Sequence, residues 1–266
     1  MASRAEQKAA ARAAREARLK AASQVQARNT RLIRLATLVG AVALVIVVII
    51  VAVGGGSGVK SYTPKQAQAI VSSLLAGIPQ NGNVLGNPNA PITLTEYGDL
   101  VCPICRDFAL AGEDQAIRHE VRQGKVKLVY SAMETASASF NGGQFAAGQV
   151  AARAAGVQHK EWNYILLWYY EQKSETTPYV TNSWIQNIAL QIPGLNLAKW
   201  QADRSNSTLG NEVQADQQAV QQMVVSKQIP QPETPTLIFK GPKGTLQPIQ
   251  SVLDYTTLKK AFKLVT

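Results

Sequence analysis

The sequence predicts an α/β domain with an inserted helical block, preceded by one transmembrane helix near the N-terminus. An uncharged apolar run occupies residues 35–53. After it, a strand, a helix and a second strand are followed by a long helical block, two further strands and a last helix. With 266 residues and 46% hydrophobic content, the chain is long enough for one folded domain besides the membrane segment.

Residues 1–34 form a basic arm. They contain nine Lys or Arg residues and only two acidic ones, Glu6 and Glu16, so they contribute a surplus of seven to the formal net charge of +10. The arm therefore accounts for most of the high pI, and the rest of the chain gives little reason to expect a nucleic-acid-binding domain. The arm is either a basic helix against anionic lipid headgroups or a solvated, disordered tail.

The apolar run "LATLVGAVALVIVVIIVAV" (35–53) is long enough to cross a hydrocarbon core of about 30 Å as a helix. Basic residues lie densely before it, so the charge bias keeps the N-terminus in the cytoplasm. We predict a signal anchor that spans the cell membrane once and leaves the rest of the chain outside. A cleaved signal peptide is the competing interpretation, but the charged segment is too long and no small-x-small site ends the run.

A linker and leading segment (54–83) is expected to connect this anchor to a domain over 84–266. Alternating β-formers predict a strand at Ile92–Tyr97, and helical spacing runs from Cys102 to about Arg122, before Gly124. A second strand is predicted at 125–133.

The following block, an insertion at about 140–226, is helical in pattern and broken near Thr177-Pro178 and Pro193-Gly194. Two short strands joined at the "GPKG" turn (241–244) and an amphipathic helix at 253–265 complete the domain. The order predicts one sheet whose halves are separated by the helical insertion.

The chain has two cysteines, Cys102 and Cys105, directly after the first predicted strand. Cys102 would occupy the first turn of a helix, where unpaired N–H groups and the helix dipole stabilise a thiolate. Pro103 suits that turn, because a proline there forfeits no helical hydrogen bond. Cys105 lies one turn further in, less exposed and suited to resolve a mixed disulfide. The spacing favours a redox-active dithiol.

Two other interpretations of the cysteine pair remain. A structural zinc site needs about four ligands, and the chain adds only His119 and His159, so no metal is predicted. A purely structural disulfide that closes so short a loop would contribute little stability. No cofactor is predicted.

The stretch "TEYGDLVCPICRDF" (95–108), followed after a helical block by "TPTLIF" (234–239), resembles the DsbA family of exported thiol-disulfide oxidoreductases. The resemblance covers about residues 84–264 and is to the membrane-anchored form common in actinobacteria. It implies a thioredoxin fold with an inserted helical subdomain. It also implies a cis-proline loop facing the cysteines, which "ETPT" places at Pro235, preceded by Thr234.

The resemblance further implies roles for residues around the pair. Substrate would contact Thr234 and Pro235 on one side and Pro103 and Ile104 on the other. Glu96, six residues before Cys102, matches an acidic residue that the family has on the strand before the motif. A desolvated carboxylate there relays a proton to or from Cys105. An exposed strand carboxylate is the alternative interpretation of Glu96.

The motif also departs from known relatives. Cytosolic thioredoxins have Trp before the first cysteine and Gly-Pro between the pair, whereas this chain has Val101 and Pro-Ile, which favours the DsbA branch. The best-known strongly oxidising members carry His where Ile104 stands. Without that imidazolium the reduced thiolate is less stabilised, so we expect a milder oxidant.

The predicted function is disulfide formation in exported proteins by thiol-disulfide exchange at Cys102 and Cys105. Backbone groups beside Pro235 would hold the substrate as an added strand, and a membrane partner, quinone-linked as in the family, would reoxidise the pair. Two alternatives stay open. One is a disulfide reductase or isomerase that uses the same residues, and the other is a non-catalytic module that binds unfolded clients or senses redox state.

Overall fold

The computed structural model describes residues 62–140, 143–175, 178–251 and 254–266. The predicted basic arm (1–34) and membrane span (35–53) lie outside these residues. Among the helices that are described, none is both long and apolar enough to cross a bilayer.

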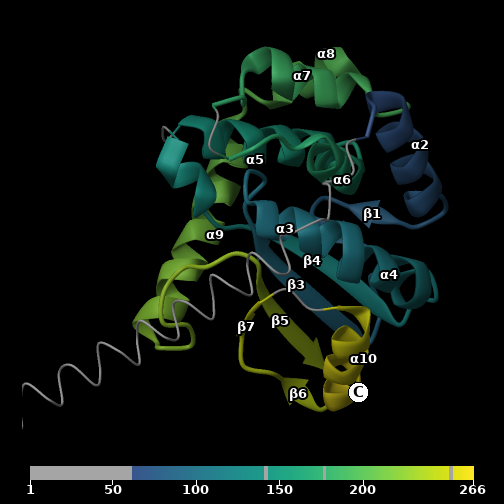
Figure 1. The fold of residues 1–266 in the computed structure, drawn as a ribbon, viewed down its shortest axis with the longest axis vertical. Coiled ribbons are helices and arrows are strands. Elements are labelled where there is room, and N and C mark those ends of the chain that lie inside the picture. Colours follow the sequence, from purple (N-terminus) through teal and green to yellow (C-terminus); the bar gives the residue numbers. More distant parts are fainter. Residues whose placement is uncertain (1–61, 141–142, 176–177, 252–253) are drawn as a thin grey trace, which may run out of the picture. The chain divides into compact units, whose positions relative to one another are not determined.

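A mixed sheet forms the centre of the domain (Figure 1). Its three long strands are β3 (Ile92–Gly98), β4 (Val126–Ala132) and β5 (Thr236–Gly241). β3 pairs parallel to β4 and antiparallel to β5. Short strands complete the order β1-β2-β4-β3-β5-β6, with β7 beside β5: β1 (Gln80–Asn81), β2 (Val84–Leu85), β6 (Gly244–Thr245) and β7 (Ile249–Gln250). The predicted strands at 92–97 and 125–133 are therefore confirmed.

The crossover from β3 to β4 is a helical run that begins at the cysteine motif. It consists of α3 (Pro103–Phe108), the π-helical segment η1 (Ala109–Glu113), α4 (Asp114–Ala116) and the π-helical segment η2 (Ile117–Val121). The helix predicted to end near Arg122 is confirmed, whereas the two π-helical segments are not predicted by its apolar spacing. Such segments are rare in proteins, and those that do occur often lie at functional sites.

A block of helices lies in the sequence between β4 and β5. After the short 3-10 helix η3 (Ala136–Phe140) it comprises α5 (Gly143–Gly156), α6 (Glu161–Glu171), α7 (Asn182–Leu190), α8 (Leu197–Asp203) and α9 (Ser207–Val225). Figure 1 shows α5 to α8 on one side of the sheet and α9 returning towards β5. The side chains of Trp162, Trp168 and Trp200 are fully buried in this block. Pro178 and Pro193-Gly194 lie outside helices, in agreement with the two predicted breaks, and Thr177 lies outside the described residues.

Two further helices pack against this framework. α10 (Tyr255–Val265) contacts β5 and corresponds to the predicted C-terminal helix. α2 (Pro64–Leu75) contacts α6 and is not predicted, because its residues were assigned to the linker and leading segment. Its start is specified locally: the Thr63 hydroxyl accepts from the Gln66 N–H while the Gln66 side chain accepts from the Thr63 N–H.

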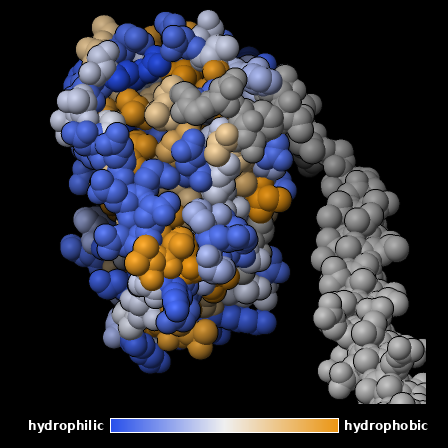
Figure 2. All heavy atoms as spheres, turned by 90° about the vertical axis from the view of Figure 1, so that its left-hand side faces the viewer, coloured by the Kyte–Doolittle hydropathy of each residue, from blue (hydrophilic) through white to orange (hydrophobic). Residues whose placement is uncertain are grey.

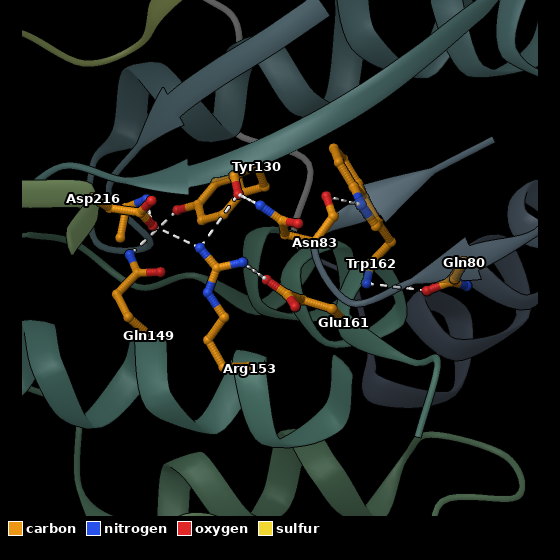
Figure 3. A network of polar contacts seen from close by, with 9 residues as sticks. Gln80, Asn83, Tyr130, Gln149, Arg153, Glu161, Trp162 and Asp216 are labelled. Carbon is orange, nitrogen blue, oxygen red and sulfur yellow. Dashed lines mark hydrogen bonds and ion pairs between the residues drawn. The ribbon is translucent and has the colours of Figure 1, made fainter. Parts of the chain in front are cut away.

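A buried ion-pair network ties the helical block to the end of β4 (Figure 3). Arg153 on α5 donates from Nη1 to Glu161 Oε1 at 2.9 Å and from Nη2 to Asp216 Oδ2 at 2.6 Å. Asp216 on α9 also accepts from the Ala132 N–H at 2.8 Å. The guanidinium therefore joins α5, α6 and α9 to the strand end that leads into the functional site.

The outward side of α9 is polar. Its exposed positions include Gln214, Gln218, Gln221 and Gln222, and this side of the molecule is mainly hydrophilic with separate hydrophobic patches (Figure 2). The opposite side of α9 contributes Val220 and Met223 to a small apolar cluster with Met133 and Ile229. This cluster anchors the chain between α9 and β5.

Candidate active site

Cys102 is the N-cap residue of α3, at the end of the loop that follows β3. Its extended backbone lets its carbonyl oxygen accept from the Arg106 N–H at 3.2 Å. Pro103 follows at the first helical position, as predicted. The thiol is 5% exposed, and the backbone N–H groups of Ile104 and Cys105 interact with its sulfur. A negative charge on Cys102 Sγ is therefore stabilised by the helix N-terminus.

The two thiols differ in acidity. The pKa of Cys102 is lowered to about 7, chiefly because the Cys105 thiol donates a hydrogen bond to it, and further by the Thr234 side chain and the two backbone N–H groups, against the opposing effect of burial. The pKa of Cys105 is raised well above its usual value, first by complete burial and then by its interaction with Cys102 and the nearby Glu96. At neutral pH the pair thus combines a partly ionised outer thiol, Cys102, with a protonated inner thiol, Cys105.

The loop before β5 covers the outer thiol. The Thr234–Pro235 peptide bond is cis, and Cys102 Sγ lies 3.6 Å from the Thr234 carbonyl oxygen. The Thr234 and Thr135 hydroxyls are hydrogen bonded at 2.6 Å, which joins this loop to the segment after β4. The structure therefore brings Cys102 together with Thr234 and Pro235, which lie more than 130 residues later in the sequence.

Asp99 organises the backbone around the pair, a role that is not predicted from the sequence. Its buried carboxylate accepts hydrogen bonds from four groups: the N–H groups of Val101 at 3.0 Å, Thr135 at 3.0 Å and Ser137 at 2.9 Å, and the Ser137 hydroxyl at 2.6 Å. Because β3 and β4 are parallel, their carboxyl ends meet at one edge of the sheet. A polar residue directly after a buried strand is the sequence signal that could have identified it.

Glu96 lies behind the inner thiol, and its side chain is 1% exposed. The alternative of an exposed strand carboxylate is therefore wrong. In the β3–β4 register Glu96 is paired with Tyr130, so the two side chains share one face of the sheet. A Cβ at Gly98 would lie 2.8 Å from the Tyr130 ring and 3.0 Å from Glu96 Oε1, so glycine is required where these groups meet.

Burial sets the protonation of Glu96. Its pKa is raised well above the usual value, first by desolvation, then by the nearby Glu113 carboxyl, and least by Cys102. Burial therefore favours the protonated, neutral form of this carboxyl, which lies next to Cys105.

Glu113 is a second buried carboxyl in this pocket and is not predicted from the sequence. It ends the π-helical segment η1 and is 1% exposed. The helical periodicity could have identified it, because Glu113 lies on the buried face of the run. The apolar residues of that face are Cys105, Phe108, Ala109, Gly112, Ala116 and Ile117.

The remaining predicted residues occupy different surroundings. Ile104 is 46% exposed beside Cys102 and presents an apolar surface next to the reactive sulfur. His119 lies against the Tyr255 ring, with ring centroids 5.4 Å apart, and His159 follows α5 with a positive φ of 57°. Among the residues that the structure describes, no three metal-binding side chains converge.

The region that matches a known protein family contains the whole site. Residues 79–255 match the family model described as thioredoxin. The chain belongs to the thioredoxin family. The chain is 24% identical over 144 residues to "Probable disulfide bond formation protein D" of Bacillus anthracis, and the match covers 53% of this chain and 64% of the relative. It therefore spans less than two thirds of the length of the curated relatives that it matches.

Solved structures of thioredoxin-fold oxidoreductases are similar over most of the domain. Oxidised BdbD from Bacillus subtilis superposes with a TM-score of 0.55 at 18% identity, over 70% of this chain and 96% of that one. Pseudomonas aeruginosa DsbA2 gives a TM-score of 0.53 at 21% identity, over 71% and 97% of the two chains. The predicted DsbA-like thioredoxin fold is thus confirmed.

Proposed function

We propose that the chain is an extracytoplasmic thiol-disulfide oxidoreductase, which introduces disulfides into exported proteins through its Cys-Pro-Ile-Cys motif. The observation that carries the proposal is the unequal acidity of the two thiols, with the pKa of Cys102 at about 7 and that of Cys105 raised. Thiol-disulfide exchange requires one sulfur that readily becomes a thiolate. The name of the Bacillus anthracis relative, a disulfide bond formation protein, supports the same chemistry.

The reaction begins with the oxidised Cys102–Cys105 bridge. A substrate thiolate attacks Cys102 Sγ, the bridge breaks, and Cys105 Sγ leaves with the electron pair. Since the pKa of Cys105 is raised by burial, the leaving thiolate takes a proton, and the neutral Glu96 supplies it. A second substrate thiolate then attacks the substrate sulfur of the mixed disulfide and releases Cys102 as a thiolate. The substrate has lost two electrons, and the pair has gained them.

Substrate would bind over the outer thiol. The backbone next to Thr234 and Pro235 lies against Cys102 Sγ and would pair with an extended segment in the manner of an added strand. On the other side of the sulfur, Pro103 and the exposed Ile104 offer an apolar contact. Both contacts are suited to unfolded segments of varied sequence. The strand-like pairing uses only backbone groups of the substrate, and the apolar contact is non-directional.

We expect a reduction potential between about −270 mV, the value of thioredoxin, and about −120 mV, that of the strongest oxidant of the fold. The pKa of Cys102 at about 7 is near that of thioredoxin and well above the roughly 3.5 of that oxidant, so its thiolate is only moderately stabilised. The potential is measured by equilibration with glutathione, and the oxidised protein should restore activity to a reduced, unfolded disulfide protein. Ile104→His is the matched variant and should shift the potential upwards.

A potential at or below that of thioredoxin, with insulin reduction but no oxidative refolding, would instead identify a reductase. Absence of any exchange that depends on Cys102 would leave a client-binding or redox-sensing module.

We further propose that residues 35–53 anchor the domain in the cell membrane, with residues 1–34 in the cytoplasm and a quinone-linked membrane protein as the reoxidising partner. The apolar run and the basic residues before it support the anchor and its orientation. The reoxidising partner is what the resemblance to the DsbA family implies. Protease added to intact cells should digest a tag at the C-terminus and spare one at the N-terminus. A soluble secreted species that lacks residues 1–53 would indicate a cleaved signal peptide.

A further inference from the structure

Behind the inner thiol, two carboxyl groups are buried together, and no cation from the described part of the chain is paired with either. Glu96 and Glu113 are each 1% exposed, and none of their four carboxyl oxygens has a hydrogen-bond partner of standard geometry within the described part of the chain. Burying two unpaired carboxylates would be prohibitively unfavourable, so the pair holds at least one proton.

Among the described residues, no cation is paired with Glu113. The titratable groups that interact with the two carboxyls are Cys102 and Cys105 at α3, Asp114 on α4, Tyr130 on β4 and Tyr169 on α6. Asp114 is itself paired with Arg118 at 2.7 Å, so that cation is already engaged. A buried glutamate at this position costs stability without forming an ion pair, which points to a chemical role.

We propose that Glu113 is a positioning residue for proton transfer, which acts through Glu96 and makes the two carboxyls a shared proton reservoir for Cys105. This inference rests on the proposed function, because the reservoir is needed only if the Cys102–Cys105 bridge opens. Glu113 is not a direct donor to Cys105, since the carboxyl that influences the Cys105 thiol is Glu96.

The reservoir balances charge during the exchange step. Before the step both carboxyls hold protons, and the pKa of Glu113, raised to about 8 mainly by desolvation, keeps it protonated at neutral pH. When the bridge opens, Glu96 gives its proton to the Cys105 thiolate. The pair then retains the proton of Glu113, shared between the two carboxyls, so the new negative charge is spread over both. Reoxidation returns the proton from Cys105 to Glu96 in the reverse sequence.

The test is the pH profile of bridge opening in the oxidised full chain, measured as the rate of reduction by dithiothreitol per dithiothreitol thiolate between pH 6 and 10. In the wild type this rate should fall near pH 8, because the pair then has only one proton to begin with and its transfer would leave two buried carboxylates. Glu113→Gln should lower the rate below pH 8 by about tenfold, the equivalent of one pKa unit, and should lose the fall near pH 8.

Three further variants separate this role from a structural one. Glu96→Gln removes the donor and should lower the rate more, by about 100-fold at all pH values. Glu113→Asp keeps an acid at this position and should retain the fall near pH 8. Glu120→Gln is the matched control, since Glu120 belongs to the same helical run, lies outside the pocket and binds the Tyr255 hydroxyl at 2.8 Å, and should leave the profile unchanged.

The inference is overturned if Glu113→Gln retains the shape of the wild-type profile, even at a uniformly lower rate, because a structural residue would act equally at every pH. Failure of the proposed function looks different. In that case the wild-type chain itself would show no reducible bridge, or no exchange that Cys102→Ala abolishes.

Discussion

Replacing Cys105 with alanine is expected to leave the protein covalently attached to its substrates. In this variant Cys102 Sγ loses the hydrogen bond from the Cys105 thiol, but the Thr234 side chain and the backbone N–H groups at the helix N-terminus still favour its thiolate. It therefore still exchanges with substrate disulfides, but the inner thiol that would release the substrate is gone. Mixed disulfides with exported proteins should therefore accumulate and be visible on non-reducing gels after alkylation.

Cys102→Ala should trap nothing and lose exchange completely. Cys105 is fully buried and its pKa is raised by that burial, so it is neither accessible nor ionised. The double variant serves as the control for non-specific disulfides. Equal trapping by the two single variants would contradict the assignment of outer and inner thiol.

Replacing Arg153 with methionine should lower the free energy of unfolding by about 3–5 kcal/mol at pH 8, because it leaves buried carboxylates without their cation. Glu161 is 1% exposed and Asp216 is mostly buried, and both are within 3 Å of the guanidinium. Urea unfolding followed by circular dichroism measures the loss.

The loss should be smaller at pH 5. Burial is the largest influence on Glu161 and raises its pKa to about 7, even though Arg153 lowers it. Without Arg153 the folded-state pKa of Glu161 rises further above the unfolded value. Glu161 therefore does not destabilise the fold at a pH below its unfolded-state pKa. The destabilisation develops as the pH rises through the folded-state pKa, where the buried carboxyl loses its proton. Lys199→Met is the control, since its ion pair with Asp203 is half exposed and should contribute less than about 1 kcal/mol. Equal losses in both variants would contradict a special role of the buried network.

Much of the fold was predictable because its signals are local. The strands β3 and β4 were predicted to within about a residue, β3 from its alternation, and helical spacing predicted the run from Cys102 and the helix α10. The helix α2 was missed although Thr63 and Gln66 form a capping box, because the glycine-rich segment before it favoured a linker. The π-helical segments have no comparable local pattern, since they depend on how the run packs against the sheet.

The sequence by itself determined which side chains are the candidates for the chemistry of the pair. The chain has only two cysteines, and their position after a strand and at a helix start identified the outer thiol, while the resemblance supplied Glu96 and Pro235. The tertiary structure alone decided that Glu96 is buried, that Glu113 shares its pocket and that Asp99 joins the loops. Most Asp and Glu side chains are exposed, and desolvation depends on atoms that are distant in sequence. The acidity of a carboxyl or thiol is therefore a property of the packed domain, and a sequence motif alone does not predict it.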